Sequence, residues 1–599
     1  MIEEATVEKV TGENRMMEEA ANEKVLLVAI NAKYIHSNLA VYCLKKYAKE
    51  FQNHIEIAEY TINQYTDFIL QNIYKRRPKV IAFSCYIWNI HYVTALIKDL
   101  RKVLKDVEIW VGGPEVSYRA KEFLEEYPQV NGVMVGEGEK IFLNLIKMWM
   151  KDLKQTTDVK ELEDKSLQVI RGIVYRDNEG NILENPNEEL LDLSEVPFPY
   201  DDLTQFQNKI IYYESSRGCP FSCSYCLSSI DKKLRFRNLE LVKQELQVFL
   251  DAKIPQVKFV DRTFNCKKSH SMEIWNYILE HDNGITNFHF EVSADLIDDE
   301  ELELFQKMRP GLIQLEIGVQ TTNETTIQEI HRTMKLERLK YVVDKINSFG
   351  NIHQHLDLIA GLPYEGLESF KKSFDDVYAM KPEQLQLGFL KVLNGAYMHM
   401  MAKNYELLYT DAPPYEVLST KWLSYDEILS LKKVENVVEI YYNSRQFVNS
   451  IQYLEKKFES PFKMYEALGN YFEIQKLDEV KHSRIRMYEI LLEFAQNTFE
   501  EDEVFLELLK LDVYLRENIK SRPKFASQDE DEKLELRAFY NEYKNISKNI
   551  HIERFGIDVV EWMKRQEIVK RKQFILFDYR TMNPVNHQCR VEELEKIHK

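Results

Sequence analysis

Cysteine is scarce in this sequence, and long apolar runs are absent. Only seven cysteines occur among 599 residues, an odd number without regular pairing, which excludes the disulfide framework of a small secreted protein. The longest apolar runs, such as Val25–Ile30 and Val80–Phe83, have the length of a strand and are too short to cross a membrane. The first 23 residues are acidic and lack an apolar signal core, so we expect a disordered extension over 1–23 and a cytoplasmic protein.

Positive charge is also in short supply. The formal net charge is −18, which disfavours nucleic acid and anionic membranes as partners, although a local basic groove is not excluded. Hydrophobic residues make up 44% of the chain, enough for several packed cores. We therefore expect a globular protein of several domains in a reducing compartment, where closely spaced thiols bind metal or carry redox chemistry.

Short apolar strands alternate with amphipathic helical segments over residues 24–150. This alternation predicts a Rossmann-like, doubly wound domain, in which helices cover both faces of a parallel sheet. Ligands of such sheets bind beyond the carboxyl ends of the strands. The expected strands are Val25–Ile30, Ile55–Tyr60, Val80–Phe83, Val107–Val111 and Gly132–Val135, and the expected helices are Leu39–Ala48, Tyr92–Leu104 and Glu115–Tyr127.

The remaining chain divides into three parts. Residues 151–210 form a connector in which a glycine turn at Asp177–Gly180 predicts a β-hairpin. Residues 211–395 contain six strand–helix units, which predict a partial (β/α)6 barrel of TIM-barrel type with its chemistry on the loops after the strands. Residues 396–599 have mostly helical spacing, with a capping box at Ser424–Glu427, and predict an α-helical carboxyl-terminal domain. The expected barrel strands are Ile211–Ser215, Gln256–Val260, His289–Val292, Ile313–Val319, Leu356–Ile359 and Gln386–Leu390, with helices at Leu239–Asp251, Ser269–His281 and Leu336–Phe349.

Three of the seven cysteines lie within eight residues, directly after the first expected barrel strand. Cys219 and Cys223 are separated by three residues, and Cys223 and Cys226 by two. A short loop with this spacing can direct three thiolates to three irons of one cubane cluster, and it leaves the fourth iron open for a ligand from outside the protein.

Two other interpretations of these cysteines are open. Structural zinc needs a fourth ligand and usually a second Cys-x-x-Cys knuckle, whereas the sole other cysteine nearby is Cys266, forty residues on. A dithiol redox site needs only Cys223 and Cys226 and leaves Cys219 without a role. We favour the iron–sulfur cluster. Cys266 is a candidate catalytic thiol near the expected mouth of the barrel, although a buried inert thiol is the commoner case.

The segment Ser216–Cys226, Ser-Arg-Gly-Cys-Pro-Phe-Ser-Cys-Ser-Tyr-Cys, resembles the signature of the radical S-adenosylmethionine (SAM) superfamily. The resemblance implies that Cys219, Cys223 and Cys226 ligate a 4Fe–4S cluster and that SAM chelates the fourth iron. One-electron cleavage of SAM then gives methionine and a 5′-deoxyadenosyl radical. The resemblance also implies a low-potential electron donor, such as flavodoxin or ferredoxin, as a partner.

The same resemblance assigns SAM contacts to the loops after several barrel strands. Phe259–Asn265 corresponds to a segment that usually reads Asp-Asp-Thr-Phe, from which Arg262 departs, and Leu315–Gln320 corresponds to the fourth-strand segment. An ordinary structural role for any single residue stays open. The SAM-binding residues that the resemblance implies are Tyr225, Asp261, Glu291, Ser293, Glu316, Gln320 and Ile359.

A doubly wound domain directly ahead of such a barrel resembles the cobalamin-binding radical SAM proteins. Gly112–Glu115 and Gly136–Glu139 recur in that group, and Asn31–Asn38 together with the carboxyl-terminal region is similar to the subgroup that ends in a DUF4080 domain. The match covers nearly the whole chain beyond residue 23. The implied cobalamin-binding residues are Asn31, His36, Ser84, Tyr86, Trp88, Gly112, Gly113, Pro114, Glu115, Gly136, Glu137, Gly138 and Glu139.

Two cofactor signatures are missing from the first domain. No Gly-x-Gly-x-x-Gly follows the first strand, which leaves no dinucleotide fingerprint. No Asp-x-His-x-x-Gly occurs either, and His36 lacks an aspartate two residues before it. We therefore expect cobalamin to be held without a histidine ligand. Aromatic packing by Tyr86 and Trp88 and a domain that has lost cobalamin are open alternatives.

Together these features predict a radical SAM enzyme that transfers a methyl group to an unactivated carbon of an unknown organic substrate. One alternative uses the same cofactors for cyclisation, oxidation or rearrangement without methyl transfer. Another is a radical SAM enzyme that modifies tRNA or protein without cobalamin, which the acidic balance disfavours for tRNA. The last is a non-catalytic iron–sulfur protein.

Overall fold

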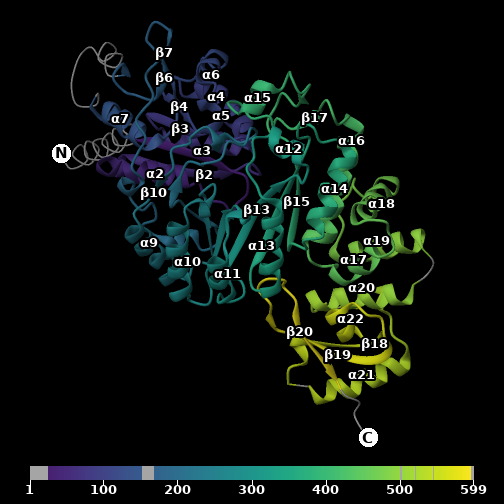
Figure 1. Cartoon of the computed structure of the whole chain (residues 1–599). Helices are drawn as coiled ribbons and strands as arrows, with labels where there is room; N and C mark the ends of the chain where they lie inside the picture. The colour runs from purple at the N-terminus through teal and green to yellow at the C-terminus, as the bar shows by residue number, and fades with distance from the viewer. Residues whose placement is uncertain (1–23, 152–166, 500–501, 520, 544, 595–599) are drawn as a thin grey trace, which may run out of the picture. The chain divides into compact units, whose positions relative to one another are not determined.

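The computed structural model describes residues 24–151, 167–499, 502–519, 521–543 and 545–594 (Figure 1). The extension expected over 1–23 lies outside the described residues. The described chain divides into two compact units. The first contains the residues up to Glu291 together with Lys391–Asn404 and Leu408–Val417, and the second contains Val292–Leu390, Tyr405–Leu407 and the residues from Leu418 onward. Among the described helices, none combines the length and apolar composition needed to cross a membrane.

The first unit begins with a seven-stranded sheet in the order β2-β1-β3-β4-β5-β6-β7. Its first five strands are parallel. The hairpin expected in the connector is formed by β6 and β7, which pair antiparallel and extend the sheet beyond β5. The strands are β1 (Val25–Asn31), β2 (Ile55–Thr61), β3 (Val80–Ser84), β4 (Glu108–Gly112), β5 (Gly132–Met134), β6 (Ile173–Arg176) and β7 (Ile182–Glu184).

Helices cover both faces of this sheet, which explains why strands such as β1 and β3 are apolar without alternation. One face packs on α2 (Leu39–Tyr47) and α7 (Gly138–Lys151). The opposite face packs on α3 (Thr66–Arg76), α4 (Ile90–Val103), α5 (Pro114–Ser117) and α6 (Ala120–Glu126). These two apolar layers confirm the doubly wound prediction.

The single helix predicted over Glu115–Tyr127 is wrong, because the chain breaks there into α5 and α6. Arg119 leaves the helical region at φ −138° and ψ 36°. Tyr118, at the break, packs against Gly395, where an added Cβ would lie 2.5 Å from the Tyr118 Cγ atom. A long-range contact therefore accompanies the interruption, and the local helical pattern does not reveal it.

Six parallel strands of the expected barrel are present, three in each unit. In the first unit, β11 pairs with β8 on one side and β12 on the other. In the second unit, β14 pairs with β13 and β15. The first set is β8 (Ile211–Tyr213), β11 (Gln256–Phe259) and β12 (Asn287–Val292), and the second is β13 (Ile313–Gln320), β14 (His353–Ala360) and β15 (Gln384–Phe389).

Amphipathic helices follow these strands in sequence. The helices of this region are α9 (Leu239–Asp251), α10 (Lys268–Glu280), α11 (Asp299–Gln306), α12 (Glu324–Glu329), α13 (Leu336–Phe349) and α14 (Leu367–Tyr378). On β13 the buried side chains Leu315, Ile317 and Val319 alternate with Glu316 and Gly318, which lie on the opposite face.

The carboxyl-terminal region of the second unit is dominated by helices, as predicted, and its first helix has the expected capping box at Ser424 and Glu427. The helices are α16 (Tyr425–Val438), α17 (Val448–Glu455), α18 (Pro461–Ile474), α19 (Arg484–Thr498), α20 (Glu503–Arg516), α21 (Glu530–Glu542) and α22 (Val559–Arg565). An antiparallel sheet, which was not predicted from the sequence, follows α21. Its strands, drawn in yellow in Figure 1, are β18 (Ile550–Ile557), β19 (Lys570–Met582) and β20 (Cys589–Leu594).

After β15 the chain contributes a segment to the first unit, which we call the return segment (Lys391–Asn404 and Leu408–Val417). It contains α15 (Tyr397–Met401). Within it, the Val392 amide donates a hydrogen bond to the Tyr415 carbonyl at 3.0 Å. The return segment brings residues beyond the barrel strands into the unit that holds the three cysteines.

Candidate active site

The three clustered cysteines lie on a loop between two short paired strands. β9 (Ser216–Arg217) and β10 (Arg235–Phe236) pair antiparallel and close the base of this cysteine loop. Cys219 and Cys223 are 8% exposed each, and Cys226 is partly exposed. All seven cysteines of the chain lie in its described part, and none of them forms a disulfide. The loop therefore offers three reduced sulfur ligands.

The entry to the cysteine loop requires a glycine. Gly218 has φ +95°, and an added Cβ there would lie 2.6 Å from the Lys233 carbonyl oxygen, far inside a normal contact. The next residue is held as well, because the Cys219 amide donates to the Asp231 carbonyl at 3.1 Å. On the other side of the loop, the Met398 amide of the return segment donates to the Ser224 carbonyl at 2.7 Å. Backbone contacts thus fix the loop at both sides.

The donor set fits an iron–sulfur cluster. Within the described residues, no group of three His, Cys, Asp or Glu side chains lies close enough to hold one metal ion. Thiolates that ligate a cluster each bind a separate iron, so they need not converge on one point. Three thiols outside any disulfide, on one anchored loop, are the ligands that such a cluster takes.

Asp261, a predicted SAM contact at the end of β11, uses its carboxylate inside the protein. Its Oδ2 accepts from the Ser215 amide at 3.0 Å, and its Oδ1 accepts from the hydroxyls of Ser215 at 2.7 Å and Ser216 at 2.6 Å. Burial raises the pKa of Asp261 to about 6, although these hydrogen bonds act to lower it. The carboxylate ties the end of β11 to the residues that precede the cysteine loop.

Cys266, the candidate catalytic thiol, is half-buried. Burial, followed by the charges of Cys219 and Asp261, raises the pKa of Cys266 to about 11. A thiol with a raised pKa is a poor nucleophile at neutral pH, because the thiolate is the reactive form. The structure therefore gives no activation of this residue.

The other predicted SAM contacts belong to three places in the fold. Tyr225 lies partly exposed in the cysteine loop, and Glu291 lies partly exposed on β12. In the second unit, Ser293 donates through its hydroxyl to Asp295 at 2.7 Å. Glu316, Gln320 and Ile359 are carried by β13 and β14 of the second unit.

Gln320 has an unusual backbone, with φ +72° at the end of β13. Its side-chain amide lies over Gly318, where an added Cβ would be 2.3 Å from the Gln320 Nε2 atom. The register between β13 and β14 shifts at this point. A positive φ in a residue other than glycine is strained, and such strain recurs at binding sites. On β14, His355 Nε2 lies 3.1 Å from Asp357 Oδ1 on the same face as Ile359.

The residues predicted for cobalamin follow the carboxyl ends of β1, β3, β4 and β5. After β1, Asn31 donates through Nδ2 to the His36 carbonyl at 3.1 Å and to Glu59 at 3.0 Å. His36 Nδ1 lies 2.6 Å from the Tyr212 hydroxyl. Burial, with the charges of two lysines, lowers the pKa of His36, so its imidazole is neutral at pH 7. Both side chains fasten the loop after β1.

After β3, an aromatic pair stands at the edge of the sheet. The rings of Tyr86 and Trp88 stack with centroids 4.4 Å apart and an angle of 7°. Trp88 is 41% exposed and donates through its indole nitrogen to the Ile30 carbonyl at 3.1 Å. Ser84, at the end of the strand, accepts from the Asn38 amide group at 3.3 Å. A flat, partly exposed aromatic surface suits the apolar face of a corrin ring.

After β4, the Gly112–Glu115 turn is fixed by close packing. Gly113 has φ +117°, and a Cβ there would lie 2.4 Å from the Cys85 carbonyl oxygen. Pro114 occupies the first turn of α5. Glu115 is 8% exposed and accepts a hydrogen bond from the Tyr415 hydroxyl of the return segment.

After β5, Gly136 lies beside open space, whereas the two glutamates that follow are in ion pairs. A Cβ at Gly136 would meet no atom within 4 Å, so space is open there. Glu137 and Glu139 instead form ion pairs with arginines next to the cysteine loop. The open space at Gly136 and the exposed face of Trp88 fit a corrinoid at this edge, whereas the two carboxylates are already bonded within the protein.

The contacts of Arg217, Arg235, Met398 and Tyr415 were not predicted from the sequence. Arg217 stands inside the recognised cysteine signature, and that position is the one local signal that marks it. Met398 and Tyr415 reach the first unit through the return segment, which no local pattern indicates.

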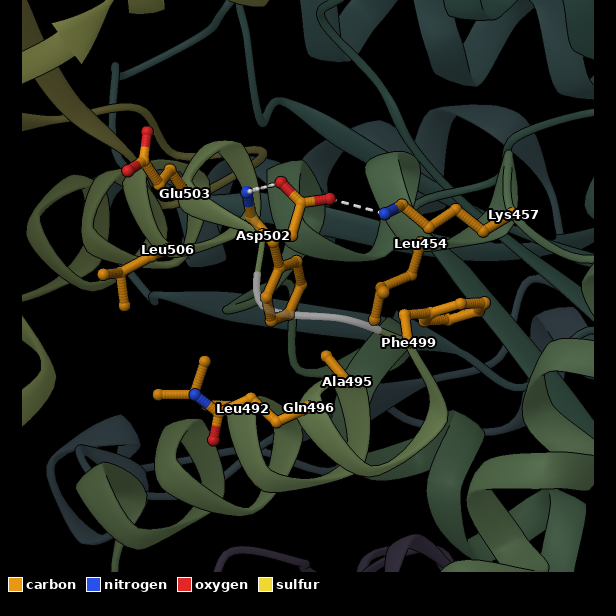
Figure 2. A pocket seen from close by; sticks show the side chains of 10 residues that line it. Leu454, Lys457, Leu492, Ala495, Gln496, Phe499, Asp502, Glu503 and Leu506 are labelled. Carbon is orange, nitrogen blue, oxygen red and sulfur yellow. Dashed lines mark hydrogen bonds and ion pairs between the residues drawn. The ribbon is translucent and has the colours of Figure 1, made fainter.

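A pocket of about 170 Å³ lies elsewhere, in the second unit between α17, α19 and α20 (Figure 2). Its wall is largely apolar, and Lys457 bonds to Asp502 at 2.5 Å beside it. None of the residues predicted from the sequence lines this pocket. Its lining residues are Leu454, Lys457, Leu492, Ala495, Gln496, Phe499, Asp502, Glu503, Phe505 and Leu506.

Three family models match the chain in order. The B12 binding domain matches residues 25–146, the radical SAM superfamily matches residues 213–377, and DUF4080, a protein family of unknown function, matches residues 403–577. The second match contains the cysteine loop, and the first contains the loops after β1, β3, β4 and β5.

Curated relatives share low identity with this chain. The cobalamin-dependent radical SAM methyltransferase TokK of Streptomyces tokunonensis is 25% identical over 338 residues, which are 53% of this chain and 48% of that protein. An anaerobic magnesium-protoporphyrin IX monomethyl ester cyclase of Rubrivivax gelatinosus is 21% identical over 322 residues, 51% of this chain and 55% of that protein. The chain spans about half the length of these two relatives.

A solved structure resembles most of the chain. The cobalamin-dependent SAM radical enzyme OxsB, with aqua-cobalamin and SAM bound, superposes with a TM-score of 0.57 over 89% of this chain and 85% of that chain, at 16% identity. This likeness concerns the fold. With the matched family models, it confirms the predicted α/β class: a Rossmann-like domain, a parallel partial barrel and a helix-dominated carboxyl-terminal region.

Proposed function

Because this chain belongs to the radical SAM superfamily, in the group with a B12-binding domain ahead of the radical SAM domain and a DUF4080 region behind it, we propose that it is a cobalamin-dependent methyltransferase. Its substrate is an organic molecule that carries an unactivated carbon. The relative TokK is named as a cobalamin-dependent radical SAM methyltransferase, which supports methyl transfer here.

One observation carries the proposal. The cysteine loop and the carboxyl edge of the B12-binding sheet lie in the same compact unit, and Arg217 bonds to Glu139 across them at 2.8 Å. The two places where cofactors would bind are therefore held together by the protein itself. A radical generated at one cofactor and a methyl group carried by the other must reach one substrate, so this proximity is what the reaction needs.

The chain's own residues hold and orient these groups. Cys219, Cys223 and Cys226 would ligate the cluster and leave one iron for SAM. Tyr225, Asp261, Glu291, Ser293, Glu316, Gln320 and Ile359 stay our proposed SAM-binding residues, with Asp261 acting through the backbone it fixes. When bound, the cluster supplies one electron to SAM and the corrinoid carries the methyl group.

At the B12-binding edge, we propose that Trp88 and Tyr86 pack on the corrin ring and that the backbone of Gly112–Pro114 and Gly136–Gly138 borders it. Asn31, His36 and Ser84 hold the loops after β1 and β3 in place through their hydrogen bonds. The return segment packs on the same edge through Tyr415 and Gly395. It is thus placed to exclude water from the space between the cofactors.

A second candidate keeps the cofactors but omits net methylation. The cyclase of Rubrivivax gelatinosus matches about as much of this chain as TokK does, which favours cyclisation, oxidation or rearrangement as the alternative. An enzyme that modifies tRNA or protein without cobalamin is less well supported, because the chain carries a matched B12-binding domain and a net charge of −18.

The proposal includes a partner and a compartment. Reduction of the cluster needs a low-potential donor, for which flavodoxin or ferredoxin is our candidate. Closely spaced thiols outside any disulfide suit the reducing and oxygen-poor interior of a cell, so we place the protein in the cytoplasm.

Anaerobic production with cobalamin supplied tests the cofactor assignment. We expect the purified protein to contain iron and sulfide at the level of one 4Fe–4S cluster, together with a bound corrinoid. A variant with all three loop cysteines changed to alanine should lose the iron and keep the corrinoid. A full cluster without corrinoid would overturn the cobalamin part of the proposal and leave the radical part standing.

A further inference from the structure

The two glutamates after β5, Glu137 and Glu139, form ion pairs with arginines that flank the cysteine loop. The Arg217 guanidinium pairs with Glu139 at 2.8 Å, with Glu137 at 3.4 Å and with Glu214 at 2.7 Å. All four side chains are at most 22% exposed. Arg217 lies two residues before Cys219, so carboxylates of the B12-binding domain pair with the arginine at the entry of the loop.

A second chain of contacts runs from Glu137 to the loop backbone. Glu137 pairs with Arg235 at 2.6 Å, and Arg235 pairs with Asp231 at 2.8 Å. The Asp231 carbonyl in turn accepts from the Cys219 amide at 3.1 Å. The backbone amide of Leu191 also donates to Glu137 at 3.0 Å. The position of the first cluster cysteine therefore depends on a glutamate of another domain.

From this arrangement, and resting on the proposed function, we propose that Glu137 and Glu139 are positioning residues for the iron–sulfur cluster rather than corrinoid ligands. They fix the entry of the cysteine loop through Arg217 and Arg235. They also neutralise the guanidinium charge beside Cys219, and so set the reduction potential of the cluster.

The sign of the effect follows from charge. Reduction adds an electron to the cluster, and a positive charge nearby stabilises the added electron. Net charge and hydrogen bonding around a cluster are among the factors that set its potential. The low exposure of these side chains limits screening by solvent and salt. Removing a carboxylate leaves the positive charge of Arg217 less neutralised, so the reduction potential should become less negative. Removing the guanidinium leaves negative charge in excess, so the reduction potential should become more negative.

Substitutions that remove charges of opposite sign distinguish an electrostatic effect from a loosened loop. In the anaerobically purified, corrinoid-loaded protein, Glu139→Gln should shift the cluster potential to a less negative value, and Arg217→Gln should shift it to a more negative value. The double variant should return close to the wild-type potential. Redox titration followed by electron paramagnetic resonance of the reduced cluster measures all three. A loop that is merely looser would move both single variants in the same direction.

Glu56→Gln is the matched control, because Glu56 forms a similar pair with Arg76 at 2.7 Å on the same unit but away from the cysteine loop. We expect no shift in that variant and wild-type iron and corrinoid contents in Glu139→Gln. If Glu139→Gln loses its cluster, Glu137→Gln and Glu214→Gln remove the same charge from Arg217 and should show the same sign.

Two outcomes would overturn the inference. One is an unchanged potential in Glu139→Gln and Arg217→Gln with the cluster intact. The other is loss of corrinoid from Glu139→Gln at an unchanged potential, which would make the carboxylate a corrinoid contact. Both leave the proposed function standing, because that proposal is tested on the wild-type protein, by its cluster and corrinoid contents and by the products it forms from SAM.

Discussion

The Tyr415 hydroxyl donates a hydrogen bond to the buried carboxylate of Glu115, which lies 300 residues earlier in the chain. Glu115 follows β4 in the B12-binding domain, and Tyr415 belongs to the return segment. Burial raises the pKa of Glu115, and the hydrogen bond from Tyr415 opposes that rise. The contact thus fastens the return segment to the edge of the sheet where we place the corrinoid.

Tyr415→Phe removes this hydrogen bond and leaves a buried carboxylate without its donor. We expect a loss of about 1–3 kcal/mol in the free energy of unfolding, measured by urea denaturation, and a lower corrinoid content after gel filtration. Tyr425→Phe is the control, because the Tyr425 side chain is 48% exposed. Equal stability of the two variants would show that the contact does not hold the return segment.

Alanine variants of the three loop cysteines should differ from the Cys266→Ala variant in iron content. Changing Cys219, Cys223 or Cys226 singly to alanine should remove most of the iron, because we propose that each ligates its own iron of the cluster. Cys266→Ala should retain the full iron and sulfide content and the ability to cleave SAM. If Cys266→Ala keeps its cluster but no longer forms product, its thiol has a catalytic role that the raised pKa argues against.

Gly218→Ala tests the backbone that precedes the cluster. Its Cβ would lie 2.6 Å from the Lys233 carbonyl oxygen, so β9 and β10 would have to separate and the cluster should be lost. Gly180→Ala is matched in backbone, with φ +90°, but its Cβ would meet nothing within 4 Å. We expect only about 1–2 kcal/mol of destabilisation there and an unchanged iron content. A full iron content in Gly218→Ala would show that the loop accommodates the added Cβ and that this glycine is not required.

The buried carboxyl of Glu365 should make the second unit sensitive to pH. Hydroxyls of Thr321 and Ser373 donate to Glu365 Oε1 at 2.6 and 2.9 Å. Burial nevertheless raises the pKa of Glu365 from 4.5 to about 7. The folded chain therefore binds this proton more tightly than the unfolded chain. Its contribution to stability is fully present below pH 4.5 and is lost as the pH rises through about 7.

Glu365→Gln keeps an acceptor for both hydroxyls and cannot ionise. Between about pH 5 and pH 8, wild type should lose on the order of 3 kcal/mol of unfolding free energy relative to this variant. Urea denaturation at several pH values measures the difference. Parallel pH profiles for the two proteins would show that the carboxyl does not hold its proton in the fold.

The regular elements were predictable where local signals agree. Helices α9 and α13 have the predicted bounds, Leu239–Asp251 and Leu336–Phe349. Asn238 caps the first residues of α9, and Gly350 ends α13 in the left-handed region. The sheet β18–β20 was missed although Ile550 and Ile552 alternate with less buried residues on β18. The surrounding helical stripes concealed that short alternation.

The site was predictable only where its residues are neighbours in sequence. The spacing of Cys219, Cys223 and Cys226 is local, so the motif could be read directly. The ion pair between Glu139 and Arg217 joins residues 78 positions apart, and nothing in the Gly-Glu-Gly-Glu sequence indicates an arginine partner. The same holds for Tyr415 and Glu115, which meet only because the chain returns to the first unit after β15.

The products formed from SAM test the central claim most directly. The reduced protein, loaded with cluster and corrinoid, should convert SAM to both 5′-deoxyadenosine and S-adenosylhomocysteine, and the triple cysteine variant should form no 5′-deoxyadenosine. Formation of 5′-deoxyadenosine without S-adenosylhomocysteine would show that the enzyme catalyses cyclisation, oxidation or rearrangement instead of methyl transfer. Absence of both products from a protein with a full cluster would contradict the account.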